Sequence, residues 1–457
     1  MGNYNKISSA FKPFFAKSGP NDKRDAIVIH KVPKVQVPSR LRTLTPNQRS
    51  DYVNDRSAVQ KPIQEKLLEG YQNAASKHLS GKQPLAVSTI GTGTLPVVTA
   101  EVTRKTLSDL AEQPNVVAIL PNQKIKFIQP KQVNYYSELT RQETKDRMTW
   151  GLKQLNIREL WNNIPKGEGI NVAVLDTGVD GEHPALSGRV KDFIMIDPLR
   201  RRITAEPIFD SGQHGTHVCG TIAGGMTSDG VAIGVAPKAN LLVAGIFEGN
   251  MTLLTLMEGI SWAVEKGVDI INISIGFSYY EPFFDKVFED LVLYHDVLPV
   301  VAIGNEYHGN SSSPGNMRNA LAVGAMEEMP EGRIEVASFS SGASLVIPSE
   351  GLDNPVTKPD VVAPGVQIYS CVPSEHRSDE TYEHTYSYMD GTSMATPHVA
   401  GVAALLMSAR PQAAAFEIFA ALKETAKHPR GKKRRPDTRW GFGMICPVEA
   451  LKALKAK

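Results

Sequence analysis

The sequence predicts an α/β domain with a mostly parallel central sheet, preceded by a smaller α+β domain. Two observations support this prediction. From about residue 170 onward, short apolar segments rich in β-branched residues alternate with helical patterns of small residues. Such alternation is typical of a parallel sheet that carries helices on both faces. The part of the chain before the linker follows a different order of elements, which predicts a separate domain.

The N-terminal part begins with a tail over residues 1–24 and continues as a small domain over residues 25–129. Its pattern predicts a strand, a long charged helix, two strands around a glycine turn, a short helix and a final strand. These elements cover residues 25–32, 47–79, 85–102, 103–112 and 116–128, with the turn at Gly91-Thr92-Gly93. The order β-α-β-β-α-β is that of a ferredoxin-like split unit. A linker over residues 130–146 leads into the larger domain, residues 147–457.

The larger domain contains apolar segments that predict buried parallel strands, with helices between them. The strands cover residues 171–175, 240–245, 270–275, 298–303 and 320–324, and the helices include residues 255–266 and 283–294. A strand-turn over residues 440–444 and a helix over residues 447–454 end the pattern. Functional sites form at the carboxyl ends of such strands, where Asp176 and Asn305 fall.

A reactive serine is the strongest chemical signal in the chain. Residues 391–401, GTSMATPHVAG, predict that Ser393 lies in a tight turn at the start of an apolar helix, whose free N–H groups stabilise an oxyanion. Small-residue turns also precede helices for packing reasons alone, so this motif needs partners. Asp176 follows an apolar strand, and His214 begins another small-residue helix, HGTHVCGTIAG. The chain order Asp…His…Ser is the one known for subtilisin.

The chain resembles the subtilisin-like serine proteases, or subtilases, over about residues 147–450. The resemblance is carried by the segments around Asp176, His214 and Ser393 and by residues 300–306, VVAIGNE. It implies a subtilisin-like three-layer fold and a serine endopeptidase that forms an acyl-enzyme on Ser393. His214 would be the base, Asp176 would orient it, and the Asn305 amide with the Ser393 N–H would stabilise the oxyanion. We expect a structural role for His217, three residues after His214.

The same resemblance implies how a peptide substrate binds. An extended peptide would be added between two edge segments, Gly249-Asn250-Met251 and Ser274-Ile275-Gly276. The primary pocket would lie between the second segment and Ala302-Ile303-Gly304. Neither side of that pocket contains an acidic residue, which favours apolar or aromatic substrate side chains over basic ones. The alternative is that these are ordinary loop and strand-end residues.

Subtilases often carry an inhibitory pro-domain, and residues 25–129 resemble one, which implies a zymogen. The competing interpretation is an unrelated recognition domain. Pro130 disfavours cleavage after Gln129, because proline lacks the backbone N–H. We therefore predict self-cleavage after Asn134, Tyr135 or Tyr136, although the linker is longer than usual in the family, which leaves open that it is not cut.

Charge and cysteine content exclude several other classes of protein. Fifty basic and 48 acidic residues give a net charge of +2, so neither nucleic acid nor a membrane is an expected partner. The basic run 432–435 predicts a solvated loop. Three widely spaced cysteines, Cys219, Cys371 and Cys446, form neither a disulfide framework nor a metal cluster, and we expect Cys219 to be buried.

Cofactor and location are less constrained. The chemistry requires no cofactor, whereas structural calcium is common in the family; the candidate loop, residues 226–230, offers only one carboxylate, Asp229. The first residues lack the apolar core of a secretory signal, and no apolar run is long enough to span a bilayer. This predicts a cytoplasmic protein if the N-terminus is complete, and a secreted one if a signal peptide has been removed.

Two other functions are compatible with the motifs. One is a peptide ligase or macrocyclase of the same fold, in which an amine replaces water at the acyl-enzyme. The other is a catalytically silent scaffold that binds peptides without cutting them. The presence of Asp176, His214, Ser393 and Asn305 together argues against the scaffold.

Overall fold

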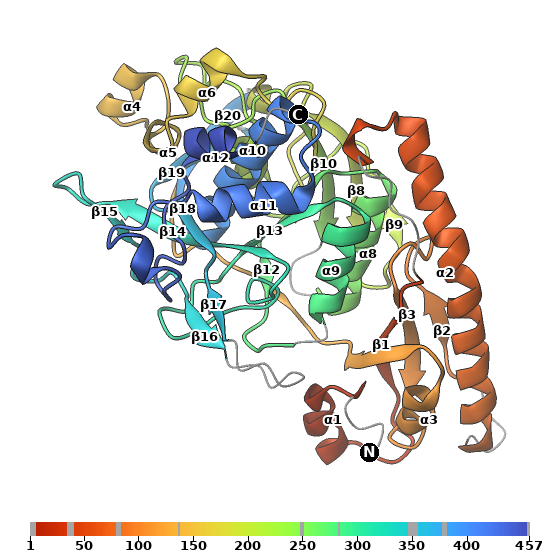
Figure 1. Cartoon of the computed structure of the whole chain (residues 1–457). Helices are drawn as coiled ribbons and strands as arrows, with labels where there is room; N and C mark the ends of the chain where they lie inside the picture. The colour runs from red at the N-terminus through yellow and green to blue at the C-terminus, as the bar shows by residue number, and fades with distance from the viewer. Residues whose placement is uncertain are drawn as a thin grey trace.

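The structure is a computed structural model, and it describes most of the chain. The described residues are 6–33, 41–78, 84–135, 138–246, 251–281, 284–345, 355–376 and 382–454. The small domain and the large domain pack side by side, with the long helix α2 (Pro46–Ala75) along the outer flank of the small domain (Figure 1).

The small domain has the order of elements that the sequence predicts. Its strands are β1 (Arg24–His30), β2 (Val87–Thr89), β3 (Val97–Val102) and β4 (Val116–Pro121), with α2 after β1 and α3 (Leu107–Glu112) after β3. The strands form a four-stranded sheet in the order β2-β3-β1-β4, and each neighbouring pair is antiparallel. The predicted helix over residues 47–79 ends as the short 3₁₀ turn Ser76–His78.

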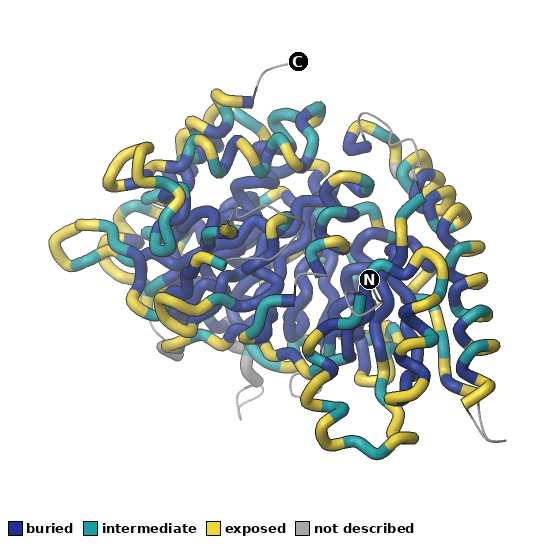
Figure 2. Tube along the Cα trace, turned by 60° about the horizontal axis from the view of Figure 1, so that its bottom comes forward, coloured by how far each residue is buried: buried dark blue, intermediate teal, exposed yellow. Residues whose placement is uncertain are grey.

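Strand β1 is buried on both faces. Ala26 and Val28 lie in an apolar cluster with residues of α2 and α3, whereas Ile27 and Ile29 lie in a second cluster with helices of the large domain. This division follows from strand geometry, since successive side chains point to opposite faces. The small sheet is therefore a layer between its own helices and the large domain, and the buried positions dominate the contact region in Figure 2.

The large domain is organised around a parallel sheet, as the sequence predicts. Among the described residues the sheet has nine strands in the order β15-β14-β13-β11-β7-β10-β8-β9, with β18 beside β14. These strands are β7 (Asn171–Asp176), β8 (Val190–Ile196), β9 (Arg202–Ile203), β10 (Asn240–Ile246), β11 (Ile270–Ile273), β13 (Leu298–Ala302), β14 (Leu321–Glu328), β15 (Ile334–Val336) and β18 (Val361–Pro364). The pairs are parallel except at β9 and β15, which lie at the two edges.

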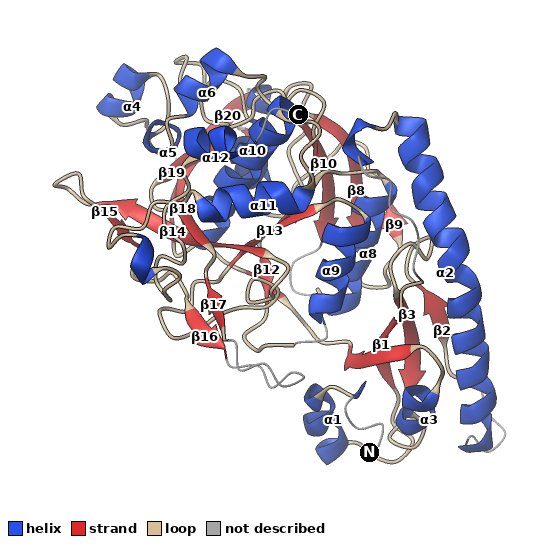
Figure 3. Cartoon of the chain, in the orientation of Figure 1, coloured by secondary structure: helices blue, strands red, loops and turns tan. Residues whose placement is uncertain are grey.

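Helices cover both faces of this sheet, which gives three layers (Figure 3). Val172 and Val174 face the cluster that contains α7 (His214–Ala223) and α10 (Thr392–Ala409). Ala173 and Leu175, on the opposite face, meet α8 (Leu253–Glu265) and α9 (Asp285–Tyr294). Further helices lie at the periphery: α4 (Arg141–Asp146), α5 (Trp150–Gln154), α6 (Ile157–Asn163), α11 (Ala415–Glu424) and α12 (Pro447–Ala453).

Two predicted strands are wrong in a way that matters for the site. The strand expected over residues 270–275 ends at Ile273, and the next residues form β12 (Ile275–Gly276), outside the sheet. The strand expected over residues 116–128 likewise ends at Pro121, and β5 (Lys126–Phe127) forms after it. The two leftover pieces pair with each other, β5 against β12. Tertiary pairing, rather than the apolar run, therefore decides where these strands end.

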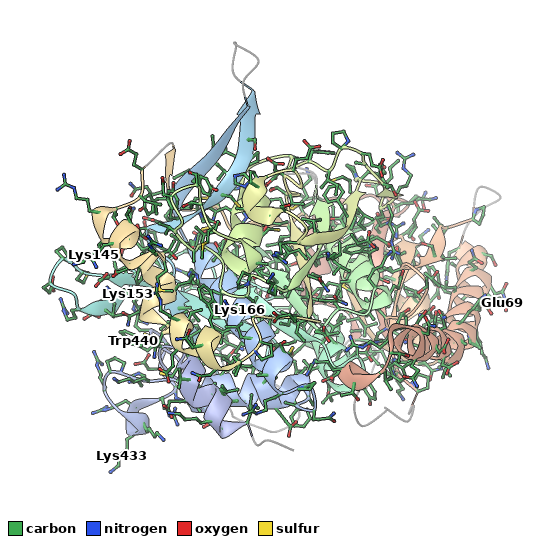
Figure 4. All side chains as sticks on the ribbon, turned by 90° about the horizontal axis from the view of Figure 1, so that it is seen from above. Glu69, Lys145, Lys153, Lys166, Lys433 and Trp440 are labelled. Atoms are coloured by element: carbon green, nitrogen blue, oxygen red, sulfur yellow. The ribbon has the colours of Figure 1, made fainter. Side chains whose placement is uncertain are left out.

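A three-stranded antiparallel sheet was not expected from the sequence. It consists of β19 (Ile368–His376), β20 (Tyr382–Asp390) and β6 (Gln132–Tyr135), in the order β19-β20-β6. The hairpin of β19 and β20 projects from the body of the molecule (Figure 4). Residues 440–444, predicted as a strand-turn, form a turn with single bridges from Met444 to Val362 and Lys427.

The smaller expectations have mixed outcomes. Cys219 is buried, as predicted. The basic run is exposed through Lys432, Lys433 and Arg434, and Lys433 points away from the fold (Figure 4). In the parts of the chain that the structure describes, no helix combines the length and apolarity needed to cross a bilayer. The cellular compartment stays a prediction.

Candidate active site

Asp176 and His214 meet at the carboxyl edge of the central sheet. Asp176 is the last residue of β7 and is fully buried, and His214 is the first residue of α7. The imidazole Nδ1 lies 2.7 Å from Asp176 Oδ1, which also accepts a hydrogen bond from Thr177 N at 2.8 Å. A carboxylate in this position fixes the tautomer and the orientation of the ring.

A second carboxylate, Asp210, ties together the segments that carry these two residues. Its Oδ1 accepts from Thr177 Oγ1 at 2.5 Å, and its Oδ2 accepts from Thr216 N and Oγ1 at 2.8 and 2.7 Å. Sequence reasoning missed Asp210. The available signal was a carboxylate four positions before His214, with threonines directly after Asp176 and two positions after His214.

Ser393 and Asn305 lie together at the start of α10. Ser393 is the second residue of the helix, and Asn305 follows Gly304, whose φ of +111° needs glycine. Asn305 Oδ1 accepts from Thr392 N at 3.0 Å and from Thr392 Oγ1 at 2.9 Å. These two bonds orient the amide so that its Nδ2 donors point into the cleft.

The cleft is filled by the end of the small domain. Phe127 pairs with Ile275 and Lys126 with Gly276, antiparallel, while Ile128 N donates to Ser274 O at 2.9 Å. On the other side, Ile125 N donates to Met251 O at 3.0 Å. Four of the residues predicted to bind substrate therefore hold this segment: Met251, Ser274, Ile275 and Gly276.

The remaining predicted substrate-binding residues have other outcomes. Gly249 and Asn250 lie outside the described residues. Ala302 is fully buried at the end of β13, and a Cβ added to Gly304 would meet the Ser312 side chain. Their place in a primary pocket stays a prediction. A hollow of about 860 Å³ runs beside the segment, between Gln129, Gly276, Asn305 and Ser312.

Two neighbouring carbonyl groups of this segment reach the predicted catalytic residues. Ser393 Oγ donates to Ile128 O at 2.6 Å, and Asn305 Nδ2 donates to Gln129 O at 2.9 Å. The ring of Phe127 lies 6.3 Å from that of His214, centre to centre. Asp176, His214, Ser393 and Asn305 are therefore gathered around one short stretch of main chain.

Beyond this point the linker continues as β6 along β20. Lys131 N donates to Asp390 O at 2.7 Å, and the pairing runs from Gln132 opposite Asp390 to Tyr135 opposite Ser387. The predicted cleavage positions Asn134 and Tyr135 thus lie in β6, past the residues that contact Ser393, and Tyr136 lies outside the described residues. Sequence reasoning missed both the stretch that occupies the cleft and the strand that receives the linker.

Two buried histidines near the site have structural roles. His217 Nε2 lies 3.0 Å from Ile368 O and 3.2 Å from Ser387 O, and burial lowers the pKa of His217 to about 3. His398 Nδ1 lies 2.8 Å from Met394 O, and burial lowers the pKa of His398 to about 4. The neutral ring of His217 thus bridges α7 to β19 and β20, as the predicted structural role requires.

A calcium site does not fit the loop that the sequence suggested. Asp229 is its single carboxylate, and the Thr227 carbonyl oxygen already accepts a hydrogen bond from Gly230 N at 2.9 Å. Across the described residues, no group of three or more His, Cys, Asp or Glu side chains could hold a metal ion.

Comparison with known proteins agrees with this geometry. The subtilase family model matches residues 167–443. M-protease of Shouchella clausii (strain KSM-K16) is 35% identical over 281 residues, which cover 61% of this chain and 64% of that protein. Subtilisin Savinase of Lederbergia lenta is 34% identical over 281 residues, which cover 61% of this chain and 90% of that protein.

A solved structure extends the likeness to the small domain. Fervidolysin from Fervidobacterium pennivorans, described as a keratinolytic enzyme related to subtilisin, has a TM-score of 0.65 and 26% identity. The alignment covers 94% of this chain, so it includes most of the small domain, and 61% of fervidolysin. The chain thus spans less than two thirds of fervidolysin and of M-protease. The family match covers more than half of the chain and includes all four predicted catalytic residues: this protein belongs to the subtilase family of serine proteases.

Proposed function

We propose that this protein is a serine endopeptidase whose small N-terminal domain holds it as a zymogen. Ser393 is the nucleophile, His214 the general base and acid, and Asp176 the group that orients His214. The Asn305 amide and the Ser393 N–H bind the oxyanion. The catalytic chemistry of the family requires no cofactor.

One observation carries the proposal: two main-chain carbonyl groups accept hydrogen bonds from Ser393, the nucleophile, and from Asn305, the amide donor. Ser393 Oγ contacts Ile128 O and Asn305 Nδ2 contacts Gln129 O, so the cleft receives a peptide backbone where a substrate would lie. The strand pairing with Ile275 and Gly276 holds that backbone extended.

The reaction follows from these positions. His214 takes the Ser393 proton while Oγ attacks the substrate carbonyl carbon, and the carbonyl oxygen becomes an anion held by Asn305. His214 then gives the proton to the leaving amine, and water releases the acyl group by the reverse steps. In subtilisin itself, loss of the corresponding asparagine donor lowers turnover by about 10²–10³.

The small domain's own segment occupies the cleft in an unproductive register. Attack requires the hydroxyl and the oxyanion donors to act on one carbonyl group, whereas here they contact two adjacent ones. The hydroxyl proton is engaged by Ile128 O, and a serine hydroxyl has only one proton to donate. The carbonyl at Asn305 also precedes Pro130, so the segment can block the cleft without being cut at Gln129.

The same segment supports an apolar substrate preference. Ile125, Phe127 and Ile128 are buried in the cleft, whereas Lys126 between them is exposed. The Ile128 side chain comes within 3.3 Å of where a Cβ on Gly276 would stand, so glycine at this position leaves room for it.

A labelling experiment tests the function. A fluorophosphonate should phosphonylate Ser393 in the wild-type chain, and Ser393→Ala should show neither adduct nor peptide hydrolysis. Absence of any wild-type adduct, with or without the small domain displaced by mild denaturant, would contradict the proposal.

Intact mass spectrometry tests the inhibitory segment. Pro130→Ala restores a backbone N–H, and we expect that variant to accumulate fragments cut next to residue 129 faster than the wild type. The double variant Pro130→Ala with Ser393→Ala is the matched control and should stay whole. Equal stability of the wild type and Pro130→Ala would show that Pro130 does not protect the segment.

A further inference from the structure

The free edge of β20 lies on the path of any peptide that crosses Ser393. β20 ends at Asp390, and only Gly391 and Thr392 separate it from Ser393. Its other edge is already paired with β19. The linker occupies the free edge through the bond from Lys131 N to Asp390 O and through four paired positions of β6.

We propose that this edge is an extended binding site for the part of a substrate that follows the cut, which joins β20 as an added strand. The proposal rests on the proposed function and adds a substrate class to it. The carbonyl held by the oxyanion donor Asn305 belongs to Gln129, so the corresponding cut follows residue 129. Gln132 is the third residue after that cut, and Tyr135 is the sixth. The favoured substrates are therefore polypeptides with at least six extended residues beyond the bond.

Contacts other than those with β6 hold β20 in place. His217 contacts the carbonyls of Ile368 and Ser387, one on each strand of the hairpin. The Tyr388 hydroxyl donates to Glu143, and its ring lies 4.8 Å from that of Tyr369. A preformed edge loses little conformational freedom when a strand is added, which favours binding.

The linker and β20 are paired through the main chain at four positions. Among the side chains described there, Lys131 and Gln132 are exposed and Val133 is half-buried. Recognition by strand addition depends chiefly on the peptide backbone. We therefore expect the site to read the length and extension of the peptide rather than its sequence.

In the intact chain, β6 and a substrate compete for the same edge. An unpaired strand edge is open to association with other chains, and β6 covers it while the zymogen is closed. Displacement of β6 would expose the edge at the moment when the cleft becomes available.

A peptide series tests the site with the full-length chain. All peptides carry residues 125–131 of the sequence with alanine in place of Pro130. The short peptide ends at residue 131, and the long peptide continues through residue 135. Two more long peptides carry backbone N-methyl groups, one at residues 132 and 134 and the other at residues 133 and 135. A last long peptide has alanine at all four added positions.

Four paired positions add about two main-chain hydrogen bonds to the partner strand, which predict a gain of about tenfold for the long peptide, both in kcat/KM and in affinity for Ser393→Ala. Alternate N–H groups face the partner strand, so one N-methylated peptide should lose the gain and the other should keep it. The alanine peptide should keep it too. Equal values for the short and long peptides, equal losses from the two N-methylated peptides, or a gain lost with alanine would each overturn the proposal.

Binding to Ser393→Ala separates this inference from the proposed function. If the wild type cuts none of the peptides but the variant binds them in the expected pattern, the extended binding site on β20 is supported and the protease assignment is contradicted. If the wild type cuts all of them at equal rates, the assignment stands and the extended site fails.

Discussion

Two of the contacts between the small domain and the large one are built differently. In the cleft the contact consists mainly of backbone hydrogen bonds, from β5 to β12 and from Ser393 and Asn305 to two carbonyls. Where α2 and the turn before it lie against the large domain, a region that we call the flank, the contact consists of buried ion pairs. These are Arg42 and Arg49 with Asp269, at 3.3 and 3.1 Å, and Arg56 with Asp290, at 2.7 Å.

Under the proposed function, the two contacts have different roles: the contact in the cleft blocks the active site, and the ion pairs hold the small domain in place. Backbone contacts in the cleft can be exchanged for those of a substrate, because they are the same kind of bond. A buried arginine has no such replacement, since leaving its aspartate partner unpaired in the protein is costly. We expect changes in the cleft to affect catalysis, and changes on the flank to affect attachment and stability.

The largest effect should come from the nucleophile. Ser393→Ala removes the attacking oxygen, and the same change in subtilisin lowers turnover by a factor on the order of 10⁶. The free energy of unfolding should change by only about 1 kcal/mol, the value of one hydrogen bond. Peptide hydrolysis measures the turnover, and urea unfolding of the same preparation measures the free energy of unfolding. A large loss of stability would contradict the expectation that changes in the cleft affect catalysis and not stability.

Arg56→Ala tests the flank. The side chains of Arg56 and Asp290 are 0% and 1% exposed, so the variant leaves a buried carboxylate without its arginine. The free energy of unfolding should fall by about 3–5 kcal/mol. Urea unfolding measures this change, and kcat on a short peptide should not fall.

Lys61→Ala is the matched control on the same helix. Its side chain is 68% exposed and pairs only with Glu65, at 3.9 Å, so we expect a change within about 0.5 kcal/mol. Equal effects of the two variants would remove the distinction between the buried flank and an ordinary surface.

Asn305→Ala sharpens the comparison within the cleft. The amide that now holds Gln129 O is also the proposed oxyanion donor, so kcat should fall about 10²–10³-fold while KM changes little. Steady-state kinetics separate the two constants. A rise in KM alone would mean that Asn305 binds the peptide without stabilising the transition state.

The smallest effect concerns how the free energy of unfolding depends on pH, and it comes from histidines that belong to neither contact. His217 and His398 stay neutral in the folded protein, because burial lowers their pKa values to about 3 and about 4. The unfolded chain binds protons below about pH 6.5 and the folded chain does not, so stability falls as the pH falls below that value. Each histidine should account for about 2 kcal/mol between pH 7 and pH 5.

Urea unfolding at the two pH values checks this sign. His217→Gln is the informative variant, because it keeps a donor near Ile368 O and removes one titrating group. Its loss of stability between pH 7 and pH 5 should be about 2 kcal/mol smaller than that of the wild type. An equal loss would contradict the assignment to His217.

Local patterns in the sequence predict the parallel sheet and the positions of Asp176, His214, Ser393 and Asn305. Asp176 and Asn305 lie at the ends of apolar strand patterns, and His214 and Ser393 lie at the starts of helix patterns rich in small residues. The sequence does not predict where residues 116–128 and 270–275 leave their sheets, because that depends on the pairing of β5 with β12 across the two domains. Nor does it predict that β6 joins β20, since Gln132–Tyr135 has no pattern that distinguishes a strand from a linker.

If the protein is a zymogen, as proposed, the double burial of β1 has a consequence for its activation. Separation of the domains would expose Ile27 and Ile29 of β1, together with the apolar residues of the large domain that cover them. Exposed apolar surfaces of this kind are prone to aggregation, and aggregation or digestion of the separated piece would remove it before it could bind again. We therefore expect activation to be irreversible, with the liberated N-terminal piece consumed instead of recaptured.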